Sequence, residues 1–277
     1  MPSTDAHLTH HPVKACLLAL GQMARARIRP WAHAVGFGGA LLMSLATVAQ
    51  RRPLPAMAQW SRLAAQASVQ ALPIVWVVNA LVGAIMAFVG AVQLQKFGAG
   101  LYVADLVGIS VCREMAALIT AVVMSGRTAA SFAAELATMR AQEEIDALHV
   151  LGLEPMRELV VPRVLVLLAL MPLLFFHACV AALVGGLVVA TLMLDLNSVV
   201  YAQRLMVATS PVHLWMGLGK ATVFGAWIAM AGCHAGLQAQ RSAAGVGEAA
   251  TRAVVRGIVG VIALDAVFAV VANAMGW

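Results

Sequence analysis

The feature that most constrains this chain is a series of long apolar runs separated by short polar segments. The runs cover residues 31–49, 67–94, 101–139, 159–194, 212–237 and 253–277. A membrane-spanning helix needs about 20 predominantly apolar residues, and the second to sixth runs meet that length. No alternation of apolar and polar residues appears, and the runs are far longer than the strands of a membrane barrel. We therefore predict an all-α integral membrane protein with a cytoplasmic segment at residues 1–30 and one membrane domain at 31–277.

Composition agrees with a surface that lies in lipid. Hydrophobic residues make up 62% of the 277 residues and charged residues only 11%, whereas a soluble domain carries about 25% charged residues. The net charge of +6 comes from basic residues that lie between apolar runs, so no nucleic-acid partner is expected. The four cysteines form no CxxC pair, so no metal site, cofactor or disulfide framework is expected. The first 30 residues lack the apolar region of a cleaved signal peptide.

The distribution of basic residues predicts the orientation, because cytoplasmic loops carry the excess of lysine and arginine. The segments after the third and fifth runs are basic, with Arg140, Arg157, Arg163, Arg241, Arg252 and Arg256. The loops on the other side hold only Lys96 and Arg204. We therefore predict that the loops after the third and fifth runs are cytoplasmic.

The first run is basic on both flanks, at residues 1–30 and in the linker 50–66. Both flanks are then cytoplasmic, so the simplest arrangement is an interfacial or re-entrant elbow helix at 31–49 that does not cross. Five crossings follow it, at 67–94, 101–139, 159–194, 212–237 and 253–277. The alternative is six crossings with a translocated N-terminus.

The third run carries charges inside the predicted membrane segment. They are the adjacent pair Arg113 and Glu114, then Arg127 and Glu135. Such a charge costs about 2.5–3.5 kcal/mol at the centre of a helix in lipid, so it normally faces the bundle interior or a water-filled cavity. Neighbours on a helix diverge by about 100°, so Arg113 and Glu114 cannot simply pair face to face, and each is expected to find a partner on another helix or to line a cavity. The alternative is a structural network of buried charges.

A short amphipathic helix is predicted at 141–152. Its apolar face is formed by Ala141, Ile145 and Leu148. Its N-terminal half carries Glu143, Glu144 and Asp146, where negative charge suits the helix dipole. Gly152 suits the C-terminal cap, and Pro155 prevents continuation. A helix lying on lipid is the alternative, but three acids disfavour it beside an anionic leaflet. The helix therefore predicts a protein partner.

Two further charges lie in the later runs, Lys220 and Asp265. The segment around Lys220 is not a phosphate-binding loop, because Leu214 and Ala221 stand where that motif needs glycine and a hydroxyl residue. Lys220 is expected to snorkel or to pair near a helix end, and Asp265 is a candidate partner for a basic residue. No nucleotide site appears in the sequence, so an ATPase that drives transport would be another chain.

The same residues resemble the MlaE permease family, the membrane subunits of lipid-transporting ABC systems that are paired with MCE-domain proteins. The strongest match is GRTAASFAAELATMRAQEEIDAL at residues 126–148, and it continues through Gly152, Pro155, Pro162 and Arg163. The pair Arg113-Glu114, the stretch from Lys220 to Gly225, and a C-terminal block fit the family in the same order. That block contains Gly245, Gly247, Thr251, Ala253, Val254 and Asp265. The resemblance covers about residues 30–277.

The resemblance implies a homodimeric permease in the bacterial inner membrane that is a transporter subunit and not an enzyme. It implies phospholipid in a cavity at the dimer centre, near Arg113 and Glu114, and a periplasmic MCE-domain protein. It also implies a cytoplasmic ATPase on the helix 141–152, which would use Glu143, Glu144, Ile145, Asp146 and Leu148. The remaining charges would be structural: Arg127, Glu135, Lys220 and Asp265. Some relatives carry a STAS domain, which thirty N-terminal residues cannot hold, so that partner would be absent or on another chain.

Two positions depart from the family pattern. Ala116-Ala117 stand where many members have Gly-Pro, so no proline kink is expected there, and Val89 stands where many have glutamine. One rival function is a secondary transporter driven by protons through Glu114 or Asp265, although no inverted repeat is visible. A second rival is a scaffold that does not transport.

Overall fold

The computed structural model describes residues 36–41, 43–44, 63–65, 67–68, 70–194 and 197–275. Regular structure within these ranges is helical, and no strand occurs in them. Five helices among the described residues are long and apolar enough to cross a membrane. They are Leu72–Gln95, Gly100–Ala141, Met156–Met193, Pro211–Leu237 and Ala243–Ala274. The predicted all-α membrane fold with five spanning helices is therefore confirmed.

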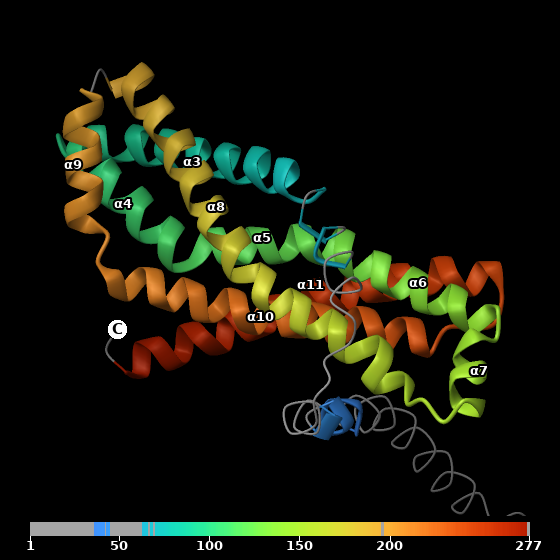
Figure 1. Ribbon diagram of the computed structural model, residues 1–277. Helices are drawn as coiled ribbons and strands as arrows, with labels where there is room; N and C mark the ends of the chain where they lie inside the picture. The colour runs from blue at the N-terminus through green and yellow to red at the C-terminus, as the bar shows by residue number, and fades with distance from the viewer. Residues whose placement is uncertain are drawn as a thin grey trace, which may run out of the picture.

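The helices form one elongated bundle (Figure 1). Two short helices mark its ends: α7, at Glu144–Val150, and α9, at Ser198–Ala208. The turn between α10 (Pro211–Leu237) and α11 (Ala243–Ala274) lies at the same end as α7. The two basic segments predicted to share one side of the membrane thus lie at one end of the molecule.

The third run of the sequence forms one composite helix of 42 residues. Two π-helical turns interrupt it, η2 at Val111–Met115 and η3 at Ser125–Ala129. Between and around them lie η1 (Gly100–Tyr102), α4 (Val103–Ser110), α5 (Ala116–Met124) and α6 (Ala130–Ala141). At about 1.5 Å per residue this helix is about 60 Å long, twice the hydrocarbon core of a bilayer, so it must tilt or project beyond the lipid.

The closest helix packing in the bundle joins α3, at Leu72–Gln95, to α8, at Val161–Leu194. A Cβ atom on Gly83 would lie 1.9 Å from the carbonyl oxygen of Ala182, and one on Gly185 would lie 2.0 Å from that of Ala80. The two backbones therefore touch at two reciprocal points, which only glycine allows. A third π-helical turn, η4 at Met156–Val160, leads into α8.

Several basic residues near the ends of the predicted runs lie in helices. Arg163 belongs to α8 and is buried. The last helix begins at Ala243, ten residues before the predicted 253, so Arg252 and Arg256 lie within α11. Helix α11 begins before the predicted run because a helix continues wherever its own hydrogen-bond ladder is intact, whereas a hydropathy pattern records only the part that suits lipid.

The predicted amphipathic helix at 141–152 is confirmed as α7, with shorter bounds. Glu143 precedes it in the left-handed region at φ 62°, and Gly152 follows it at φ 74°. The Gly152 amide donates to the carbonyl of His149 at 3.0 Å, and the Leu153 amide donates to that of Leu148 at 2.9 Å. These two bonds are a Schellman cap, which ends α7 at the predicted glycine.

Helix α9 was not predicted from the sequence. Asn197 caps its N-terminus by accepting a hydrogen bond from the Val199 amide at 2.9 Å. Tyr201 is buried beside Ala104 and Ala190, and burial raises the pKa of this tyrosine to about 12. The side chain of Arg204 lies 3.3 Å from Asp105 at the start of α4. Helix α9 is thus packed onto α4 at the end opposite α7.

The predicted elbow at 31–49 lies largely outside the described residues. Its described pieces, 36–41 and 43–44, are helical. Phe37 in the first piece packs edge-on against His234 of α10, with ring centroids 5.1 Å apart. Residues 1–30 and the linker 50–62 lie outside the described residues.

Candidate functional site

The deepest charge in the described bundle is Lys220, in the middle of α10, whose side chain is only 1% exposed. Its ammonium donates to the carboxylate of Glu114 in η2 and, at 3.0 Å, to that of Asp265 in α11. A buried cation is costly unless it is paired, and two carboxylates from different helices supply the pairing. Asp265 pairs with a basic residue, as expected, but Lys220 neither snorkels nor lies at a helix end.

Arg113 completes the group, with its Nε 3.7 Å from Glu114 Oε1. Glu114 has a partner on another helix, as expected, but the expectation that the two adjacent side chains cannot simply pair was wrong. Both side chains are long enough to bend toward each other, and they lie in a π turn, where the regular 100° spacing of an α-helix does not hold. We name Arg113, Glu114, Lys220 and Asp265 the polar cluster.

The polar cluster is enclosed on one side and open on the other. Lys220 is fully buried, whereas Arg113, Glu114 and Asp265 each keep about a quarter or a fifth of the side chain exposed, at 24%, 26% and 21%. Two cations balance two carboxylates, so the cluster is formally neutral. A guanidinium at such an opening can bind a phosphate in a two-pronged geometry, and the carboxylates can bind a second, basic group.

The π turns of the composite helix contain three of its charged residues. Arg113 and Glu114 lie in η2, and Arg127 lies in η3. A π turn adds one residue to a helical turn, which changes the direction in which the following side chains point, and such turns are frequent at functional sites. Ala116 and Ala117 follow η2 in a continuous helix, as expected from the missing proline.

The other predicted structural charges lie outside the polar cluster. Arg127 donates a hydrogen bond to Gln70, just before α3. Glu135 in α6 accepts one from Arg163 in α8 at 3.1 Å, and Arg163 also lies over the Phe132 ring, 5.6 Å from its centroid. The latter pair joins two spanning helices.

Helix α7 carries the residues predicted to contact an ATPase. Ile145 is buried and Leu148 is half-buried against the core, whereas Glu143, Glu144 and Asp146 are exposed. A contact that sequence reasoning missed is Arg241, in the turn between α10 and α11. Its Nη2 donates to Asp146 Oδ2 at 2.6 Å, and its Nη1 lies 3.6 Å from Glu143 Oε1. The basic character of that turn was visible in the sequence, but its partner was not.

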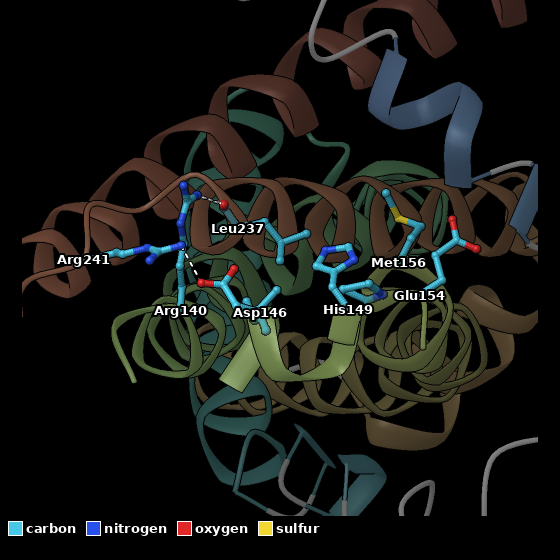
Figure 2. Close-up of a pocket in the computed structure, with 9 residues that line it drawn as sticks. Arg140, Asp146, His149, Glu154, Met156, Leu237 and Arg241 are labelled. Carbon is cyan, nitrogen blue, oxygen red and sulfur yellow. Dashed lines mark hydrogen bonds and ion pairs between the residues drawn. The ribbon is translucent and has the colours of Figure 1, made fainter. Parts of the chain in front are cut away.

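A pocket of about 400 Å³ lies between α7 and the end of α10 (Figure 2). It is lined by Arg140, Ile145, Asp146, His149, Glu154, Pro155, Met156, Leu237 and Arg241. Figure 2 shows the guanidinium of Arg241 directed at Asp146 and that of Arg140 directed at the carbonyl of Leu237. Polar contacts therefore close one edge of this pocket.

Comparison with known proteins finds a matching family and several similar proteins. The family described as Permease MlaE matches residues 60–271. A probable ABC transporter permease protein of Rickettsia prowazekii is 36% identical over 184 residues, which are 66% of this chain and 71% of the relative. A probable ABC transporter permease protein of Synechocystis is 33% identical over 192 residues, 69% of this chain and 73% of the relative. The protein TRIGALACTOSYLDIACYLGLYCEROL 1, chloroplastic, of Arabidopsis thaliana is 29% identical over 173 residues, 62% of this chain and 49% of the relative.

Proposed function

The chain belongs to the MlaE permease family and is a multi-pass ABC transporter permease subunit, and on that premise we propose that it moves phospholipid. The transfer would run between the bacterial inner membrane and a periplasmic MCE-domain protein, and the energy would come from ATP hydrolysed by a separate chain. The residues 31–277 would form the permease domain as one homodimer subunit. A separate STAS-domain protein is a further candidate partner.

The observation that best supports a lipid substrate is the geometry of the polar cluster. A neutral group of two cations and two carboxylates, enclosed at Lys220 and open at Arg113, offers complementary charges to a headgroup that carries both a phosphate and an amine. We propose that Arg113 binds the phosphate and that Glu114 orients Arg113 or binds the amine. The Arabidopsis relative, whose name contains that of a diacylglycerol lipid, supports a lipid substrate.

The proposed ATPase contact is the exposed side of α7 and its tip. Val150 is 88% exposed and Leu151 73% exposed, directly after the acidic turn. An apolar tip beside acidic side chains suits a protein groove better than an anionic leaflet. Ile145 and Leu148 would hold α7 to the bundle, while Glu144, which makes no ion pair within the described residues, would face the ATPase.

Reconstitution tests the transport function. The permease, its co-purifying ATPase and an MCE-domain protein are placed in vesicles with fluorescent phospholipid, with and without ATP and with and without a proton gradient. We expect transfer that requires ATP and is unchanged by the gradient. Transfer driven by the gradient alone would identify a proton-coupled transporter, and no transfer under either condition would favour a scaffold. Mass spectrometry of co-purified lipid would identify the species.

A single charge reversal tests the ATPase contact. Glu144→Lys leaves both ion pairs of Arg241 intact, so it should release the ATPase during co-purification while the permease stays folded. Glu248→Lys, on the exposed face of α11, is the matched control and should retain the ATPase. Reversing Glu143, Glu144 and Asp146 together should release it completely, and full retention in that triple variant would refute the contact.

A further inference from the structure

Two arginines join the α7 end of the composite helix to the end of α10. Arg241 contacts Asp146 at 2.6 Å and Glu143 at 3.6 Å, so it links the α10–α11 turn to α7. Arg140, in the last turn of α6, donates to the carbonyl of Leu237, the last residue of α10. Charge-assisted hydrogen bonds of this kind fix direction as well as distance.

Packing alone holds α7 only weakly. The helix has seven residues, of which Ile145 is the one buried side chain. The pocket of about 400 Å³ separates part of its inner face from Leu237 and Met156. A helix so short is not stable by itself, so its orientation depends on the groups that contact it. One such contact is the ion pair that Arg241 of the α10–α11 turn makes with Asp146 (Figure 2).

The helices on either side of Arg241 carry half of the polar cluster. Lys220 lies on α10 and Asp265 on α11, and the two side chains contact each other at 3.0 Å. Lys220 precedes Leu237 by about 25 Å of helix at 1.5 Å per residue. Along this length α10 packs closely on η3 and α6, where a Cβ atom on Gly232 would lie 2.8 Å from a carbonyl oxygen of η3 and one on Gly236 would lie 2.7 Å from a carbonyl oxygen of α6. A displacement at the turn is therefore carried along a stiff helix rather than absorbed.

We infer that Arg241 is a positioning residue that ties α7 to the α10–α11 hairpin, so that a movement of α7 reaches Lys220 and Asp265. This inference rests on the proposed function, in which an ATPase binds α7. An exposed ion pair contributes at most about 1 kcal/mol, so the tie can form and break within a transport cycle. Arg241 thereby couples nucleotide-driven motion at one end of the bundle to the polar cluster within it.

The first arm of the test measures the position of α7 relative to α11 in the absence of an ATPase. Spin labels at Val150→Cys in α7 and Ala244→Cys in α11 are placed in a full-length variant whose four native cysteines are alanine, held in lipid nanodiscs. We expect a narrow distance distribution that broadens in Arg241→Ala and narrows again in the charge exchange of Arg241→Asp with Asp146→Arg. Arg252→Ala, which removes only an ion pair to Glu248 within α11, is the matched control and should stay narrow. An unchanged distribution in Arg241→Ala would overturn the positioning role.

The second arm measures coupling in the complex with the ATPase that co-purifies with the wild-type chain. We expect the lipid transferred per ATP hydrolysed to fall about fivefold in Arg241→Ala, the factor that corresponds to about 1 kcal/mol. The amount of bound ATPase should stay at the wild-type level, and the charge exchange should restore the ratio. An unchanged ratio in Arg241→Ala would overturn the proposal that Arg241 transmits the movement of α7 to the polar cluster.

The two arms distinguish a failure of the proposed role of Arg241 from a failure of the proposed lipid transport. A wild-type complex without ATP-dependent lipid transfer would overturn the proposed function and the transmission with it. The spin-label arm would then still decide whether Arg241 positions α7.

Discussion

At the scale of single residues, Lys220 holds together parts of the chain that are far apart in sequence. Its ammonium contacts Glu114, 106 positions earlier, and Asp265, 45 positions later. The side chain of Lys220 is almost completely enclosed. The polar cluster therefore stabilises the helix arrangement as well as offering charges at its opening.

Lys220→Met should lower the free energy of unfolding by about 3–5 kcal/mol, because it leaves two carboxylates without their buried cation. Thermal unfolding in detergent measures the change. The double variant with Asp265→Asn should recover part of the loss, since it removes one of the uncompensated charges. A melting temperature equal to that of the wild type in Lys220→Met would show that the cluster does not stabilise the fold.

Arg113→Ala should act differently, because Arg113 lies at the open side of the cluster. We expect reduced phospholipid occupancy, measured by mass spectrometry of the purified protein, with little change in melting temperature. Arg113→Lys keeps the charge but loses the two-pronged geometry, so its occupancy should be intermediate. Arg157→Ala, another arginine in a π turn, is the control and should keep full occupancy. A large loss of stability with normal occupancy in Arg113→Ala would instead assign a structural role.

The sequence shows which residues need partners but not which partners they find. A lone lysine and a lone aspartate in apolar runs imply compensation, and this holds for Lys220 and Asp265. The contact of Arg241 with Asp146 is different, because both are ordinary surface charges that need no partner. Only the folding of the α10–α11 turn against α7 brings them together, and no local pattern records that.

At the scale of elements, the crossing of α3 and α8 depends on two glycines. Gly83 faces the backbone of Ala182, and Gly185 faces that of Ala80. Helix backbones in contact gain van der Waals packing, which is a main source of helix association in lipid. A side chain at either position would meet backbone atoms that cannot move aside.

Gly83→Ala and Gly185→Ala should each lower stability by about 1–3 kcal/mol or more, the usual cost of overpacking. The melting temperature in detergent measures this. Gly219→Ala is the matched control, because Gly219 is also helical but has no atom within 4 Å of the added Cβ. Its melting temperature should stay equal or rise slightly, since alanine favours a helix. Equal effects at all three positions would contradict close packing as the cause.

The two short helices, α7 and α9, show when a sequence pattern is sufficient to predict a helix. Helix α7 was predictable because its acidic start, its apolar face and its terminal glycine agree with one another. Helix α9 carries no such combination. It begins at an ordinary Asn cap, and its burial of Tyr201 depends on α4 and α8 lying beside it. The π turns were not predictable either, because the residues that form them are compatible with a regular α-helix.

At the scale of the whole molecule, the bundle has two distinct ends. One end has α7 and the α10–α11 turn, with the ion pairs of Arg241, and the other has α9. From the basic residues we predict that the first end is cytoplasmic. By the same rule we predict that the linker 50–66 lies on that side and that the first run is an elbow.

A cysteine at Pro53 tests this topology. Pro53→Cys should react with a membrane-impermeant maleimide only after the cytoplasmic side is opened, because both flanks of the first run are basic. A cysteine at Val150 on α7 is the matched cytoplasmic control, and one at Val207 on α9 is the opposite control. Labelling of Pro53→Cys in intact cells would contradict the elbow and favour six crossings.

The formal neutrality of the polar cluster has a consequence for energetics. A unit charge that crosses a potential of 100 mV exchanges about 2.3 kcal/mol with it, so a group that moves with net charge is driven or opposed by the membrane voltage. Arg113 and Lys220 carry two positive charges, and Glu114 and Asp265 carry two negative ones. When these four residues shift together, the electrical work on them cancels, so we expect the membrane voltage neither to drive nor to oppose that shift.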